Sequence, residues 1–172
     1  MRTYVEKYAG DVWELQILRA DHEQAVLAFE LKNRTYFAAS VSDRGDVFFE
    51  NFPDEHRASL EQQDAGGRIF HVLVDEGGAV LGRFNLYDVR HGTAEVGYRV
   101  AQELAGRGLA TSTVEELCRV AAERYGLQAM SARTKLDNAA SRRVLEKAGF
   151  VSAGPCVVAG APGMRYRRDL TA

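Results

Sequence analysis

The chain has 172 residues, of which 46% are hydrophobic and 27% charged, and its formal net charge is −2 at pH 7. This length suits one domain with a substantial core, and we expect residues 1–172 to form a single domain. No apolar run approaches the roughly 20 residues that cross a bilayer, and the N-terminal residues lack the apolar region of a secretory signal. We therefore expect a cytoplasmic protein that binds no membrane, and the acidic balance argues against nucleic-acid binding.

The cysteines and histidines show no pattern that would hold a metal. Cys118 and Cys156 stand in apolar surroundings without CxxC spacing, and the histidines are scattered without the i, i+4 spacing of helical ligands. We expect two small buried thiols in a reducing compartment and no metal site.

The first half of the chain alternates strands and helices. Residues 12–19 are predicted to form a strand, and Asp21 is predicted to cap a helix that runs to about Asn33, with Gln24 in capping-box position. A second, more exposed helix is expected over residues 53–63. Three strands follow, over residues 69–74, 79–87 and 94–101, and a hairpin-like turn joins the first two.

The second half opens with the clearest helix of the sequence. Apolar residues recur at helical spacing from Ala110 to Tyr125, and Gly126 is placed to end the helix. After a strand over residues 127–134, Asp137 or Asn138 is predicted to cap another helix. Its expected inner face consists of Ala140, Val144, Leu145 and Ala148.

Two strands, over residues 150–158 and 164–170, are predicted to close the chain. Arg165, Arg167 and Arg168 lie in the last, alternating stretch, which indicates one face of a terminal strand. The element order predicts an α+β fold, in which a mixed sheet carries helices on its faces.

A glycine-bearing turn precedes the long helix and suggests a site for phosphate. Backbone N–H groups at a helix start lack partners and attract anions. Gly106 and Gly108 remove side chains where a phosphate would approach, and Arg107 can add a charge-assisted bond. The same glycines could simply make a tight turn. A P-loop is excluded because no Gly-Lys-Ser/Thr follows, and Thr111 fits the dinucleotide fingerprint poorly.

Two blocks of residues carry a resemblance to a known family. Residues 98–100 (Tyr-Arg-Val) followed by residues 105–110 (Ala-Gly-Arg-Gly-Leu-Ala) resemble the acetyl-CoA-binding motif of the GNAT superfamily, Gln/Arg-x-x-Gly-x-Gly/Ala. Residues 138–150 (Asn-Ala-Ala-Ser-Arg-Arg-Val-Leu-Glu-Lys-Ala-Gly-Phe) are similar to the family's Asn-x-x-Ser/Ala…Gly-Phe segment. Details of this second block and the stretch at residues 29–37 resemble the Rim-type branch, which includes ribosomal-protein N-terminal alanine acetyltransferases. Ala105 departs from the motif, which usually has Gln or Arg there.

The resemblance implies a GNAT-like fold with a mixed, mostly antiparallel sheet of about six to seven strands. It implies transfer of an acetyl group from acetyl-CoA to a primary amine. The residues expected to bind the cofactor are Tyr98, Arg99, Val100, Gly106, Arg107, Gly108, Leu109, Ala110, Thr111 and Asn138. The plainer interpretation of Asn138 is a helix cap, and the motif favours contact with the cofactor.

The resemblance also implies two catalytic residues. Glu95, in the stretch Glu-Val-Gly-Tyr, is expected beside the thioester as a carboxylate that acts on the attacking amine, directly or through water. Ser141 is expected to hydrogen-bond the leaving thiolate, because the tyrosine that does so in other branches would fall at Leu145. An N–H of the strand near Tyr98 is the expected oxyanion donor. A solvent-facing carboxylate and a first-turn helix serine are the plainer interpretations of Glu95 and Ser141.

The acceptor is left open by the sequence. A protein or peptide α-amine is the leading hypothesis, because its pKa of about 7.7–8.0 makes it easier to deprotonate than lysine. A small amine, such as an antibiotic, polyamine or amino acid, is the alternative within the enzyme class, and a non-catalytic acyl-CoA-binding module is the alternative outside it. A sheet edge near the C-terminus could pair two copies into a homodimer.

Overall fold

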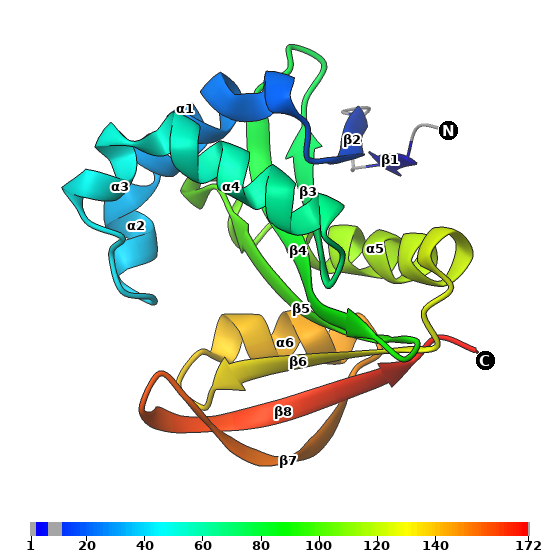
Figure 1. Ribbon diagram of the computed structural model, residues 1–172. Coiled ribbons are helices and arrows are strands. Elements are labelled where there is room, and N and C mark those ends of the chain that lie inside the picture. The colour runs from blue at the N-terminus through cyan, green and yellow to red at the C-terminus, as the bar shows by residue number, and fades with distance from the viewer. Residues whose placement is uncertain (1–2, 7–11, 172) are drawn as a thin grey trace.

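The computed structural model describes residues 3–6 and 12–171, with side chains from residue 12 onward. One eight-stranded sheet has the order β1-β2-β3-β4-β5-β6-β8-β7 (Figure 1). Its strands are β1 (Thr3–Glu6), β2 (Val12–Ile17), β3 (Arg68–Val74), β4 (Val80–Arg90), β5 (Thr93–Val100), β6 (Ala129–Lys135), β7 (Val151–Val158) and β8 (Ala161–Asp169). The helices are α1 (Glu23–Lys32), α2 (Arg34–Ala38), α3 (Asp46–Glu50), α4 (Phe52–Asp64), α5 (Leu109–Tyr125) and α6 (Ala139–Lys147). The predicted α+β fold class is confirmed.

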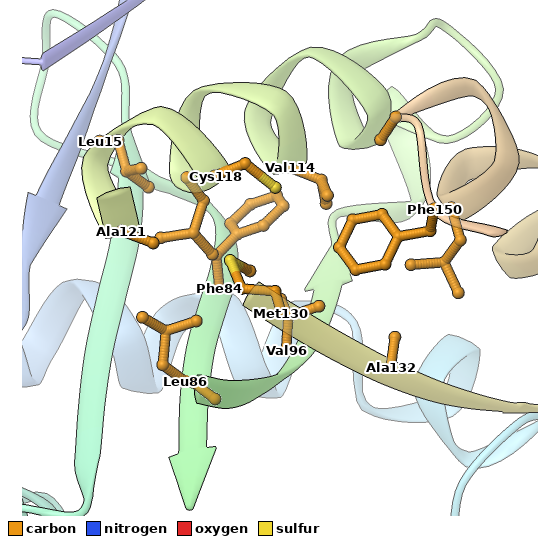
Figure 2. Close-up of a cluster of buried hydrophobic side chains, with 14 of the residues drawn as sticks. Leu15, Phe84, Leu86, Val96, Val114, Cys118, Ala121, Met130, Ala132 and Phe150 are labelled. Carbon is orange, nitrogen blue, oxygen red and sulfur yellow. The ribbon is translucent and has the colours of Figure 1, made fainter. Parts of the chain in front are cut away.

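The helices form layers on both faces of the sheet. α1 and α4 pack against β4 and β3 on one face, over a core that includes Val26, Phe29 and Val72. α5 and α6 lie on the other face (Figure 1). The core beneath them contains Phe84, Val96, Val114, Met130 and Phe150, which Figure 2 shows packed together. Burial of such side chains contributes about 1.5–3 kcal/mol each to folding.

The central strands β5 and β6 are the only parallel neighbours among the described strands. α5 connects them, as a parallel crossover requires. Their ladder is short, because it pairs Thr93 with Ala129, Ala94 with Met130 and Glu95 with Ser131 and then stops. Beyond Glu95 the two strands continue without pairing to each other, so they splay apart in the middle of the sheet.

Most predicted elements are confirmed within a few residues, and the differences have local causes. β1, which pairs with β2, was not predicted, because four residues are too short to show a period. Asp21 does not cap α1 but accepts hydrogen bonds from Arg19, and a 3-10 turn over Ala20–His22 precedes the helix. Ala140 is exposed rather than part of the inner face of α6.

The C-terminal strands and the cysteines also differ from expectation in part. Arg165 and Arg167 share one face of β8, but Arg168 lies on the opposite face and donates to the carbonyl oxygen of Ala148 in the turn after α6. Both cysteines are free thiols, yet only Cys118 is buried, since Cys156 on the edge strand is partly exposed. Within the described residues, no helix has the length and apolar character needed to span a membrane.

Candidate active site

The turn before α5 leaves its outer surface bare. Gly106 and Gly108 have φ angles of 75° and 80°, in the left-handed region that favours glycine. A Cβ atom at either position would meet no other atom within 4 Å and would project into open space. Arg107 stands exposed between them. The glycines therefore set the conformation of the turn and also leave room for a group to approach its backbone.

The N-terminus of α5 has backbone N–H groups to offer. The helix runs for 17 residues, has no side-chain cap at Gly108 and carries no acidic residue in its first turn. N–H groups in a first turn lack acceptors within the helix, and the helix dipole adds partial positive charge. Leu109 is buried, so it can contribute only through its backbone, while Ala110 and Thr111 are half-buried. A phosphate fits this end of the helix.

β5 directs backbone N–H groups into the splay between β5 and β6. The N–H of Ala101 donates to the carbonyl oxygen of Leu81 at 2.9 Å, and the register between β4 and β5 is regular from Gly82 to Tyr87. Successive N–H groups of a strand alternate in direction. The N–H groups of Tyr98 and Val100 therefore point away from β4, toward β6, where the ladder has ended. This is the position for donors to a carbonyl oxygen held between the strands.

Glu95 is the last residue of β5 that pairs with β6, and its carboxylate is held by a guanidinium. Arg133, two residues beyond the end of the ladder on β6, donates to both Glu95 oxygens at 3.0–3.1 Å. The pair lies at the surface, with side chains 27% exposed for Glu95 and 45% for Arg133. Glu95 raises the pKa of the Arg133 guanidinium above its ordinary value. The charged pair thus spans the opening of the splay.

Ser141 and Asn138 are brought together at the start of α6. The Asn138 side-chain oxygen caps the helix by accepting from the Ser141 N–H at 3.0 Å, which confirms the capping role. The Ser141 hydroxyl lies 3.2 Å from the hydroxyl of Tyr98 on β5. The Tyr98 ring stacks on Phe84 with centroids 5.8 Å apart. Burial raises the pKa of Tyr98 to about 12, and the hydrogen bond to Ser141 opposes this shift.

The predicted residues divide between the two faces of the sheet. Tyr98 and Ser141 lie on the α5/α6 face, whereas Glu95 points to the opposite face, as alternation along β5 requires. Arg99 also points to that opposite face, where it pairs with buried Glu30 at 3.1 Å. Its side chain is therefore directed away from the α5 turn. Groups on opposite faces can reach a substrate in the splay from two sides.

A family model of the acetyltransferase (GNAT) domain matches residues 10–151. The chain belongs to the GNAT acetyltransferases. It is accordingly an acetyl-CoA-dependent N-acetyltransferase, as the resemblance implied. A search of curated protein sequences finds no match to the chain.

Solved structures share the fold of this acetyltransferase. The ribosomal-protein-S5-alanine acetyltransferase from Vibrio fischeri superposes with a TM-score of 0.85 at 18% identity, over 98% of this chain and 97% of that one. Mycobacterium smegmatis RimJ in complex with CoA-disulfide gives a TM-score of 0.82 at 19% identity, over 98% of this chain and 85% of that one. A chimera of the spermidine N-acetyltransferase SpeG from Vibrio cholerae and hSSAT gives a TM-score of 0.74 at 15% identity, over 92% of this chain and 96% of that one. At these identities the likeness concerns the fold.

A hollow of about 570 Å³ lies elsewhere in the acetyltransferase. It is formed along β2 and the turn between β3 and β4, and its lining includes Glu14, Asp21, Asp75 and Glu76. None of the predicted site residues lines it. This hollow is therefore separate from the splay where the motif residues meet.

Arg133 and the Tyr98 hydroxyl are the parts of the site that sequence reasoning missed. The alternation of β6 places Ser131, Arg133 and Lys135 on one face, so a polar face was visible in the sequence. Its pairing with Glu95 was not visible, because the two residues are 38 positions apart. Tyr98 was expected to touch the cofactor, and its contact with Ser141 joins residues 43 positions apart. Both contacts depend on how the strands and helices assemble.

Proposed function

We propose that this acetyltransferase acetylates the α-amine of a protein or peptide N-terminus. The observation that carries the proposal is the pairing of Glu95 with Arg133. Because the Arg133 guanidinium donates hydrogen bonds to both Glu95 oxygens, the carboxylate is held in one position, from which it can orient an amine or a water. An α-amine, with a pKa of about 7.7–8.0, needs less help than a lysine amine, with about 10.4.

The binding part of the proposal uses the backbone of the α5 turn. Acetyl-CoA supplies the thioester and, in its diphosphate, the anion for this turn. Gly106, Gly108 and the first residues of α5 would hold the phosphates through N–H groups, and exposed Arg107 would add a charge-assisted bond. This arrangement offsets Ala105, which cannot supply the side-chain contact of the usual motif. Asn138, whose oxygen is used as a cap, would contribute through its amide N–H.

The catalytic part of the proposal places residues on both sides of the splay. Glu95 would orient the incoming amine and receive its proton, directly or through water, on the face away from α5. The N–H groups of Tyr98 and Val100 would stabilise the developing oxyanion. Ser141 would hydrogen-bond the leaving sulfur on the α5/α6 face. Tyr98, by donating to the Ser141 oxygen, would turn the serine hydrogen toward that sulfur.

The test is a direct measurement of the acceptor. The full chain is incubated with acetyl-CoA and a panel that contains free peptides, N-terminally blocked peptides with an internal lysine, polyamines and amino acids. Mass spectrometry then identifies which amine gains an acetyl group. We expect modification of the free N-termini and not of the blocked peptides. Acetylation confined to polyamines or free amino acids would contradict the peptide assignment while leaving the acetyltransferase activity intact.

A further inference from the structure

The face of β6 and β8 that lies opposite α6 is open. In Figure 1, α6 runs along one side of these strands, and among the described residues no helix covers their other side. Buried Ala132 and Tyr166 belong to the α6 side, because both join the core beneath it. Their neighbours in sequence point the other way. Arg133 and Arg165 therefore project from the open face.

This open face is rich in positive charge, and we name it the arginine face. It consists of Arg133, Lys135, Arg165 and Arg167. Arg133 stands directly opposite Arg165 across the β6–β8 ladder, a like-charge pairing that disfavours the sheet. The chain as a whole has a net charge of −2, so this local excess runs against its average.

Carboxylates neutralise only part of the arginine face. Glu95 pairs with Arg133, and Asp169 pairs with Arg167 at 2.8 Å. Within the described part of the chain, no carboxylate lies within ion-pair distance of Arg165 or Lys135. Arg165 is exposed and Lys135 half-buried. Their charges are therefore available to a partner in solution.

The arginine face begins where the acceptor amine would arrive. Glu95 pairs with Ser131 on β6, and Ser131 pairs with Arg167 on β8, so these three residues form one row across the sheet. Neighbouring strands are about 4.8 Å apart, so the backbone of Arg167, two strands away, lies about 10 Å from the backbone of Glu95. An extended chain covers about 3.3 Å per residue. A peptide whose amine lies at Glu95 would reach the arginine face with roughly its fourth to sixth residues.

We infer that the arginine face binds an acidic segment of the polypeptide acceptor, at roughly the fourth to sixth residues counted from the acetylated N-terminus. The inference rests on the proposed function, because it takes the amine to lie at Glu95. Opposite charge steers association and selects partners, and its effect at an exposed surface falls as salt screens it. A nucleic acid is the less suitable partner, since Glu95 and Asp169 interrupt the positive charge within the same face.

The experiment compares two peptides that share their first three residues and have either Glu or Gln at positions four to six. At low salt we expect kcat/KM to be about tenfold higher for the Glu peptide, through KM rather than kcat, and to converge with the Gln peptide at high salt. Arg165→Gln should remove most of the preference, and Arg165→Lys should retain it. Lys147→Gln, at an exposed position of α6 on the other side of the sheet, is the matched control and should retain it fully.

The possible outcomes separate this inference from the proposed function. Equal acetylation of both peptides at low salt would overturn the arginine face as a specificity surface and leave the peptide assignment standing. Acetylation of neither peptide, with small amines modified instead, would defeat the proposed function. Inhibition of Gln-peptide acetylation by a short RNA that Arg165→Gln relieves would assign the face to nucleic acid and would also overturn the inference. Unfolding temperatures of the variants establish that each is folded.

Discussion

The two faces of the splayed strands hold their functional groups in different ways. On the α5/α6 face, the glycine-bearing turn before α5 is formed by consecutive residues, and the Asn138 cap reaches only three positions to the Ser141 N–H. On the opposite face, Glu95 depends on Arg133, which is 38 positions away in the sequence. Backbone donors survive most side-chain substitutions, whereas a cross-strand pair is lost when one partner changes. We therefore expect cofactor binding to withstand most single substitutions and acceptor recognition to be changed by them more easily.

The largest expected effect would come from breaking the cofactor side at Gly108. Gly108→Asp places a carboxylate where phosphate would bind and should abolish the rise in unfolding temperature that CoA produces. The fold should survive, because Asp is a good helix N-cap and tolerates the left-handed region better than most residues. Gly126→Asp is the control, since Gly126 has a similar φ of 65° at the other end of α5. It should lose stability yet still bind CoA; a normal CoA shift in Gly108→Asp would refute the phosphate site.

The acceptor side is tested at Glu95. Glu95→Gln keeps the shape of the side chain but cannot receive a proton, so kcat/KM should fall by about a hundredfold. The loss should be greatest at lower pH, where more of the amine is protonated and needs assistance. CoA affinity, measured by calorimetry, should stay unchanged, because Glu95 faces away from α5. A wild-type pH–rate profile in this variant would remove Glu95 from the mechanism.

Acid should weaken the scaffold of the α5 face through His71. This buried residue links β3 to α5, with its ring 3.1 Å from the Phe84 carbonyl oxygen and 2.8 Å from the Tyr125 hydroxyl, and burial lowers its pKa from 6.5 to about 4. As pH falls, His71 is therefore protonated near pH 6.5 in the unfolded chain but only near pH 4 in the folded chain. Stability should be greatest above pH 6.5 and fall by up to about 3 kcal/mol toward pH 4.

Urea unfolding at several pH values measures this loss. His22, whose pKa burial also lowers, contributes in the same direction. The comparison is therefore with His71→Phe, which should be less stable at neutral pH but should show a shallower decline below pH 6.5. If the free energy of unfolding declines equally in the two proteins, protonation of His71 is not the cause of the loss.

The smallest expected effect is at Tyr98. Tyr98→Phe preserves the stacking on Phe84 and removes only the hydroxyl that touches Ser141, so kcat should fall about three- to tenfold with KM for acetyl-CoA unchanged. If the hydroxyl acts by orienting Ser141, the double variant with Ser141→Ala should be no slower than Ser141→Ala alone. Additive losses would mean that the two hydroxyls act separately, and a change in unfolding temperature without a change in kcat would mean a structural role.

Much of the fold was predictable because its signals are local. The apolar stripe ending at Gly126 predicted α5, and the turn residues between β3 and β4 predicted their hairpin. The predictions were wrong where a neighbouring side chain bound the expected capping residue, or where a segment was too short to show a periodic pattern. The Arg19 guanidinium donates to the Asp21 carboxylate, which therefore does not cap α1. The four residues of β1 are too few to show the alternation of a strand. The motif and the cap at Asn138 were predictable for the same reason, since each is complete within a few residues.

The sequence by itself determined the family and the cofactor through its two motif blocks, and it predicted the glycine-bearing turn before α5, because each of these is complete within neighbouring residues. Only the tertiary structure decided which side of the sheet each side chain reaches. Strand alternation, together with the early end of the β5–β6 ladder, places Glu95 with Arg133 on one face and Tyr98 with Ser141 on the other. Such pairings join distant positions through strand register, and register is fixed only when the whole sheet has packed against its helices.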